Sequence, residues 1–339
     1  MGAIREEARL VDYRKKIEVV PSRDGYGYGL LWLCEHDDRV VVCDADLAKS
    51  TRTIWVREKY PEKFLDFGIA EQDMLVQAGG MSRVGLVPFV TTYGVFVAGR
   101  AWDQIRTSIC YGNLNVKIGG AHGGISVGPD GATHQSLEEI PLMRVLPGMT
   151  VLVPTDWIEC RKATVWAATH EGPVYIRFGR EGVPVITTEE TPFTVGRAEV
   201  YRDGDDVAII ACGPLVYESL LAADVLAKEG IDARVINCHT IKPIDVETIV
   251  AAARDCGAIV TAEEGQRYGG LGGAVAEVVT EYHPVPVKIV GIPDTFGESG
   301  TPRELLERYG VTAGNIVKSC LLYTSDAADD LLCVDLGGR

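Results

Sequence analysis

The chain has 339 residues, of which 46% are hydrophobic and 24% are charged; this is an ordinary globular composition with room for two domains. Its formal net charge of −15 argues against nonspecific binding to nucleic acids or anionic membranes, although a site can still be locally basic. The nine cysteines include no Cys-x-x-Cys pair, which is typical of reduced thiols in a cytoplasmic protein.

The first half of the chain alternates short β-rich runs with longer helical stretches. Residues 1–16 are charged and lack the apolar core of a signal peptide, and no apolar run approaches the roughly 20 residues that a membrane helix needs. The predicted strands are 39–43, 64–67, 86–90, 115–118, 150–153 and 174–176. The helical patterns between them include 72–83, 97–109 and 157–170.

The second half repeats this rhythm after residues 181–197, a stretch rich in Pro, Thr, Glu and Gly that we predict to be a linker. The predicted strands are 207–211, 233–236, 258–260 and 287–290, and the predicted helices are 216–227, 246–253, 272–281, 302–309 and 313–319. Alternating helices and Val/Ile-rich strands predict parallel sheets covered on both faces. We therefore expect an α/β protein with one domain at about 15–180 and another at about 198–319.

The last segment, residues 320–339, differs in character from everything before it. It reads CLLYTSDAADDLLCVDLGGR and contains two of the nine cysteines, Cys320 and Cys333. It resembles the translated read-through of a sequencing adapter, and a natural disordered tail is the alternative. In both cases we expect this segment to lie outside the fold.

Polar and aromatic residues follow the carboxyl ends of four predicted strands in the first domain. Ligands bind at this edge in open parallel sheets. We therefore expect the residues that follow these strands to form one site. They are, in chain order, Asp46, Glu71, Tyr93, Phe96, His122, Asp130 and His134.

Three short sequence motifs resemble those of a known enzyme family. Residues 67–72, FGIAEQ, resemble the signature of the pyrimidine-binding domain of thiamine diphosphate enzymes. Residues 128–135, GPDGATHQ, resemble the transketolase substrate loop, and residues 291–300, GIPDTFGESG, resemble the end of the transketolase C-terminal domain. The resemblance covers about residues 18–319, and it implies a pyrimidine-binding domain followed by a transketolase C-terminal domain.

The resemblance implies cofactor roles for four residues. Glu71 would hydrogen-bond the cofactor's aminopyrimidine and promote deprotonation of its thiazolium carbon; the alternative is an acid favoured by a helix N-terminus. Phe96 would stack on that ring with Tyr93 beside it; the alternative is a core pair at i, i+3. Asp46 would lie near the cofactor or simply cap a strand end. A third aromatic residue, common in transketolases, is replaced here by Gly99.

The resemblance also implies substrate roles. His122, Asp130 and His134 would bind the hydroxyl groups of a ketose donor, and histidines suit proton transfer near neutral pH. The alternative for His134 is a local helix cap, and for His122 a polar residue beside a glycine-rich turn. Arg180 would bind the substrate phosphate, with Arg177 as its rival.

A partner chain is expected because the cofactor's metal motif is missing. Thiamine diphosphate enzymes hold Mg²⁺ and the diphosphate through a Gly-Asp-Gly motif, and this sequence contains none. The resemblance therefore implies that an N-terminal transketolase subunit supplies Mg²⁺ and the other half of the thiamine diphosphate site, in an α2β2 heterotetramer. We assign no metal ligand to this chain itself.

The expected function is that of the C-terminal subunit of a split transketolase. Such an enzyme transfers a two-carbon ketol unit between sugar phosphates, as in the pentose phosphate pathway, and this chain would be active only with its partner. Nearby alternatives are the C-terminal part of a 1-deoxyxylulose-5-phosphate synthase and a β subunit of a two-oxoacid dehydrogenase. A non-catalytic scaffolding subunit and a nucleotide-binding oxidoreductase are more distant alternatives.

Overall fold

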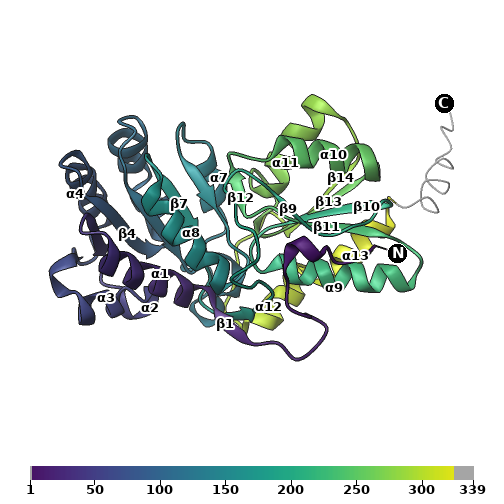
Figure 1. Cartoon of the computed structure of the whole chain (residues 1–339), viewed down its shortest axis with the longest axis horizontal. Helices are drawn as coiled ribbons and strands as arrows, with labels where there is room; N and C mark the ends of the chain where they lie inside the picture. The colour runs from purple at the N-terminus through teal and green to yellow at the C-terminus, as the bar shows by residue number, and fades with distance from the viewer. Residues whose placement is uncertain (1, 324–339) are drawn as a thin grey trace.

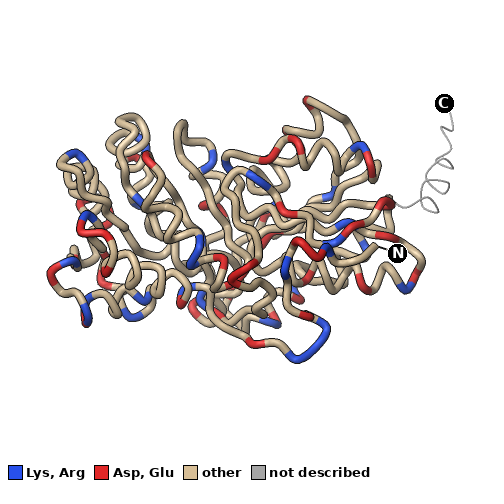
Figure 2. The backbone as a smooth tube through the Cα atoms, in the orientation of Figure 1, with Lys and Arg blue, Asp and Glu red and all other residues tan. Residues whose placement is uncertain are grey.

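Two α/β domains lie side by side in the computed structural model, which describes residues 2–323 (Figure 1). Each domain is built on one sheet, and β1 (Val19–Pro21) and β8 (Gly182–Pro184) form a separate antiparallel pair. Acidic and basic residues are interspersed over both domains rather than gathered in one block (Figure 2). Among the described residues, no helix has both the length and the hydrophobicity needed to cross a lipid bilayer.

The first sheet has seven strands in the order β12-β6-β7-β5-β4-β2-β3. All of its strands are parallel except β12. The bounds are β2 Val40–Asp44, β3 Phe64–Asp66, β4 Val87–Tyr93, β5 Lys117–Ala121, β6 Thr150–Leu152, β7 Val174–Arg177 and β12 Thr240–Lys242. The inner strands are buried on both faces, which explains their nearly continuous apolar runs, whereas Leu65 and Asp66 of the edge strand β3 are exposed.

Helices cover both faces of this sheet. Val40 and Val42 pack in one apolar cluster with residues of α1 and α8, whereas Cys43 packs on the opposite face with residues of α4 and α5. The helices of the first domain are α1 Ser22–His36, α2 Ala48–Thr51, α3 Ile54–Lys59, α4 Glu71–Arg83, α5 Gly94–Arg100, α6 Trp102–Gln104, α7 Glu139–Arg144 and α8 Trp157–Thr169. Short 3-10 turns lie at Glu6–Ala8, Pro61–Lys63 and Ile125–Asp130.

The second sheet has five strands in the order β14-β13-β10-β11-β9. Only β9 is antiparallel to its neighbour. The strands of this second sheet are β9 Glu199–Arg202, β10 Val207–Ala211, β11 Ala233–Asn237, β13 Ile259–Gln266 and β14 Val287–Ile292. Its helices are α9 Leu215–Lys228, α10 Val246–Cys256, α11 Leu271–Tyr282, α12 Pro302–Tyr309 and α13 Ala313–Leu321. The predicted class, α/β with two mainly parallel sheets, is confirmed.

The two domains are joined by more than the chain that connects them. Strand β12 follows β11 in the chain but completes the sheet of the first domain by pairing with β6. A single buried apolar cluster contains Met74 and Val97 from the first domain and Ala252 and Val275 from the second. The domains therefore share a core, as well as an edge strand.

Helix α1 is the main element that periodicity did not predict. Its glycines resemble helix breakers in the sequence, but they allow close packing in the structure. A Cβ at Gly25 would overlap the carbonyl oxygen of Trp157, and one at Gly29 would lie 2.8 Å from Cβ of Thr164. The glycines thus let α1 approach α8 at backbone distance. The predicted helix 97–109 is likewise divided, into α5, α6 and a π-helical turn at Ile105–Cys110.

The C-terminal helix α13 runs two residues further than predicted, to Leu321. Cys320 is fully buried and packs with the apolar cluster of the second domain, so it belongs to the fold. All eight described cysteines are buried and free of disulfides. The rest of the expected tail, residues 324–339 with Cys333, lies outside the described residues.

Truncation should reveal the contribution of these last described residues. We expect a chain that ends at Ser319 to unfold at a lower urea concentration than one that ends at Tyr323. The shorter chain loses the buried Cys320 and the half-buried Leu321, which should lower the free energy of unfolding by about 1–3 kcal/mol. Urea denaturation of both chains measures this difference, and equal midpoints would place residues 320–323 outside the fold.

Candidate active site

The carboxyl ends of β4 and β5 bring four of the predicted rings together. Tyr93 is the last residue of β4, and His122 follows β5 directly. Their rings stack with centroids 3.8 Å apart, and Phe96, in α5, stacks on Tyr93 at 5.5 Å. His134 meets the rings of Phe96 and Tyr93 edge-on, at 5.3 and 6.0 Å. We call Tyr93, Phe96, His122 and His134 the ring cluster.

Glu71 lies beside the ring cluster at the N-terminus of α4. Its side chain is 4% exposed, and its carboxylate accepts a hydrogen bond from Arg100 at 3.0 Å. The guanidinium of Arg100 also lies over the ring of Phe96, 4.0 Å from the centroid. Arg100 was missed in the sequence, although it follows Phe96 by four residues on α5 and so shares its helix face.

These contacts test whether the site fits a flat cofactor ring. The guanidinium is planar and donates hydrogen bonds, as an aminopyrimidine does. It stacks on Phe96 and hydrogen-bonds to Glu71 at once, so one planar group can contact both side chains. The residues present therefore fit the pyrimidine part of thiamine diphosphate.

His122 is buried and electrically neutral. It is 1% exposed, has a positive φ of 58°, and its Nδ1 has no hydrogen-bond partner among the described residues. Burial, together with the positive charges of Arg23 and Arg180, lowers the pKa of His122 to about 3. This differs from the expectation that it titrates near neutrality. His122 can therefore exchange hydrogen bonds with a ligand, but it does not carry a positive charge at neutral pH.

Arg180 and Asp130 form an ion pair near the end of β7. The distance from Arg180 Nη1 to Asp130 Oδ1 is 3.1 Å, and the same nitrogen donates to the carbonyl oxygen of Val127 at 3.2 Å. Both charged side chains are about one-third exposed. The rival Arg177 is 4% exposed and paired with Glu139 at 2.6 Å. Arg180 is thus the accessible arginine of the two.

Two further arginines, missed in the sequence, contribute positive charge at this position. Arg23, on α1, donates to the carbonyl oxygen of Ser50 at 2.9 Å, and its Nε is buried without a partner among the described residues. Burial, and then the charge of Arg52, lowers the pKa of Arg23. Arg52 pairs with Asp24 at 2.6 Å. We call Arg23, Arg52 and Arg180 the arginine cluster. Two of these arginines already pair with carboxylates, Arg52 with Asp24 and Arg180 with Asp130 and Glu181.

Asp46 lies outside the ring cluster. It is exposed in the turn after β2, has a φ of 62°, and lines a pocket of about 320 Å³ that also includes Arg57 and Asp66. Its backbone amide donates to Asp66 at 3.1 Å. Asp44 holds the turn itself by accepting hydrogen bonds from three groups. Burial raises the pKa of Asp44 to about 6.

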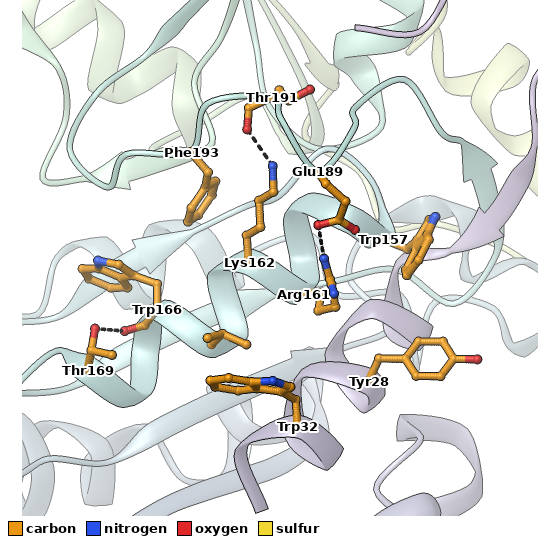
Figure 3. A pocket seen from close by; sticks show the side chains of 11 residues that line it. Tyr28, Trp32, Trp157, Arg161, Lys162, Trp166, Thr169, Glu189, Thr191 and Phe193 are labelled. Carbon is orange, nitrogen blue, oxygen red and sulfur yellow. Dashed lines mark hydrogen bonds and ion pairs between the residues drawn. The ribbon is translucent and has the colours of Figure 1, made fainter. Parts of the chain in front are cut away.

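A larger surface pocket, of about 900 Å³, is lined by α1, α8 and the segment 189–193 (Figure 3). It is lined by aromatic side chains, including Tyr28, Trp32, Trp157, Trp166 and Phe193. Its charged groups already have partners: Lys162 donates to the carbonyl oxygen of Thr191 at 2.6 Å, and Arg161 forms an ion pair with Glu189. The pocket offers an aromatic contact surface, whereas the groups suited to catalysis gather at the strand edge.

Within residues 2–323, no group of three or more His, Cys, Asp or Glu side chains is arranged to hold a metal ion.

Comparison with known families matches both domains. The model of the transketolase pyrimidine-binding domain matches residues 19–185, and that of the transketolase C-terminal domain matches residues 196–316. The chain is 41% identical over 307 residues to the 6-deoxy-6-sulfo-D-fructose transketolase subunit SqwH of Clostridium sp. (strain MSTE9), covering 91% of this chain and 95% of the relative.

Two further matches agree with these. An apulose-4-phosphate transketolase subunit of Phocaeicola vulgatus is 37% identical over 304 residues, covering 89% of this chain and 97% of that relative. A solved structure described as a split gene transketolase, inactive beta4 tetramer, superimposes with a TM-score of 0.84. It shares 48% sequence identity and covers 90% of this chain and 98% of the other.

The buried, neutral His122 should make stability depend on pH. Its native pKa is about 3, and that of His239, lowered by burial, is also about 3; both lie below the ordinary value of 6.5. The unfolded chain therefore binds more protons between pH 6.5 and pH 3, so the free energy of unfolding falls as the pH falls through this range. Each histidine should contribute about 1.4 kcal/mol per pH unit well below pH 6.5.

His122→Asn should remove one of these two contributions, because asparagine tolerates a positive φ and does not titrate. Urea denaturation at pH 7 and pH 5 measures the effect. His36→Asn, at an exposed position on α1, is the matched control and should keep the slope of the unmodified chain. An unchanged slope in His122→Asn would mean that the pKa of His122 is not lowered in the native protein.

Proposed function

Because this chain belongs to the transketolase family, with the pyrimidine-binding and C-terminal domains found in split enzymes of that family, we propose that it is the C-terminal subunit of a split transketolase. In this proposal the assembled enzyme transfers a two-carbon ketol unit between sugar phosphates. The observation that carries the proposal is that Glu71 and Phe96 both contact one planar group, the guanidinium of Arg100. This is the arrangement that a flat cofactor ring needs.

Thiamine diphosphate, when bound, supplies the carbon nucleophile of the reaction. Glu71 holds a proton against the pyrimidine nitrogen, and its burial at 4% exposure keeps water from competing for that contact. Phe96 presents its ring face to the pyrimidine, and Tyr93 packs behind Phe96. Arg100 would have to leave the face of Phe96 for the pyrimidine to stack there.

The ring cluster and the arginine cluster divide the recognition of the donor sugar. Neutral His122 offers an unpaired nitrogen to a hydroxyl group, and Asp130 and His134 lie on the adjoining loop. Arg180 and Arg23 supply positive charge for the anionic end of the sugar. A phosphate and a sulfonate share this anionic chemistry, so sugars of both classes are candidate donors.

We propose that an N-terminal transketolase subunit supplies Mg²⁺ and the diphosphate half of the site, in an α2β2 assembly. The sequence lacks the Gly-Asp-Gly motif that would hold the metal. The two relatives named as transketolase subunits match this chain over 95% and 97% of their length, which supports a subunit of this size. A similar split gene transketolase is described as an inactive beta4 tetramer, which supports inactivity without a partner.

The proposal predicts activity only in the reconstituted complex. The chain alone should show no ketol transfer and no thiamine diphosphate binding at micromolar concentration, because it holds only the pyrimidine half of the site. Calorimetry with Mg²⁺ measures binding. A coupled assay with the partner then compares phosphorylated, sulfonated and uncharged ketose donors. Micromolar binding by the chain alone would refute the shared site, and condensation of pyruvate instead of ketol transfer would favour a synthase.

Glu71→Ala should slow proton exchange at the cofactor's thiazolium carbon in the complex by roughly 10²–10⁴-fold, because alanine cannot hold the proton at the pyrimidine. Hydrogen–deuterium exchange followed by NMR measures this rate. Asp73→Ala is the control, because Asp73 lies in the same helical turn but is exposed. If both variants exchanged at the unmodified rate, Glu71 would be an ordinary helix-start residue.

A further inference from the structure

The loop that contains the proposed donor-binding residues is held from the second domain. We call residues 123–135 the donor loop. Its first part, near Ser126, packs against β13, and its last part, near Gln135, packs against residues 297–299. None of these second-domain residues belongs to the ring cluster or the arginine cluster.

Glu264 makes the first of these contacts. It lies in β13, is 2% exposed, and its Oε1 accepts a hydrogen bond from the backbone amide of Ser126 at 2.5 Å. Arg177 donates to the carbonyl oxygen of the same residue at 2.5 Å. Glu264 is buried and its carboxyl oxygen faces the Ser126 amide at close range, so this contact fixes the start of the donor loop.

Gln135 makes the second contact. It is 2% exposed, and its Nε2 donates to the carbonyl oxygen of Glu298 in the second domain at 2.8 Å. The same nitrogen lies 3.2 Å from the carbonyl oxygen of Ile125, within the donor loop. One side chain thus joins the two ends of the loop to each other and to the second domain.

The packing leaves little room for the loop to move. A Cβ added at Gly297 would overlap Oε1 of Gln135 and lie 2.5 Å from Cδ1 of Ile125. A Cβ added at Gly131 would lie 2.7 Å from Oγ of Ser299. The second domain therefore contacts the donor loop at its middle as well as at both ends.

We infer that Glu264 and Gln135 are positioning residues, which hold the donor loop against the second domain so that Asp130 and His134 keep the geometry needed to bind a ketose donor. This role rests on the proposed function. It assigns the second domain a task in substrate binding, although its own residues do not touch the substrate.

The first test does not depend on activity. The amide of Ser126 donates to Glu264, so Glu264→Ala in the isolated chain should raise its hydrogen-exchange rate by about tenfold to a hundredfold. Glu264→Gln keeps an acceptor oxygen and should restore most of the protection. Arg177 keeps its pairing with Glu139 in both variants, which should preserve folding. Unchanged exchange at Ser126 in Glu264→Ala would overturn the inference even if the enzyme is active.

The second test uses the reconstituted complex. Gln135→Met removes the hydrogen bonds at similar volume, and Gly297→Ala displaces the loop from the second domain. Both variants should raise the KM for the ketose donor by about tenfold or more, as expected when a buried hydrogen bond is lost. Neither variant should change the KM for the aldose acceptor or the rate of proton exchange at the cofactor. Gly273→Ala is the control, because the nearest atom to its added Cβ is 3.8 Å away.

The two tests separate failure of this inference from failure of the proposed function. If the unmodified complex shows no ketol transfer, the proposed function fails and the exchange of Ser126 still decides whether Glu264 positions the loop. If ketol transfer is present but Gln135→Met and Gly297→Ala match the control in donor KM, the positioning role is wrong. A loss of cofactor proton exchange in these two variants would also overturn it, by showing general damage to the site.

Discussion

A guanidinium that is removed from water must be neutralised, and Arg177 meets this requirement at the centre of the molecule. It ends β7, pairs with Glu139 of α7 at 2.6 Å, and donates to the carbonyl oxygen of Glu264 in β13 at 2.5 Å. Losing one partner of such a buried pair typically costs about 3–5 kcal/mol. The interaction therefore fixes a strand of the first domain, a helix beside the site and a strand of the second domain relative to one another. Arg180, three residues later, reaches the strand edge from this fixed point.

The shared apolar core also fixes the two domains relative to each other, through hydrophobic burial. The apolar cluster that contains Met74 of α4 also contains Val275 of α11, and β12 of the second half completes the first sheet. Apolar burial has no direction of its own, whereas the ion pair of Arg177 and the ladder between β12 and β6 do. Together they place the loops of the second domain next to the strand edge where the ring cluster lies. The site is thus built by one domain and supported by both.

The sequence predicted most of the fold because its central elements are strongly patterned. The bounds of β10 and α12 agree with the predicted ranges, and the strand-end rule placed Tyr93 and His122 at one edge. The failures have physical causes. Helix α1 was missed because its glycines, which resemble helix breakers, allow close contact with α8; Arg23, which lies on α1, was missed with it. Strands β9 and β12 were missed because they are short antiparallel edge strands with little periodicity. The low pKa of His122 arises from burial and from arginines distant in sequence, which no local pattern reveals.

The contact between Arg100 and Phe96 has a consequence for ligand affinity. Arg100 is tethered to the site it covers, so it acts as a built-in competitor whose local concentration is on the order of millimolar. Any flat molecule that stacks on the same ring face must displace Arg100. The cost is about 1–2 kcal/mol, for an ion pair whose arginine is half-exposed and a cation–π contact. A ring face that is already occupied in this way discriminates against weak aromatic binders. Arg100 therefore contributes to ligand selectivity, because every ligand that stacks on Phe96 must first displace it.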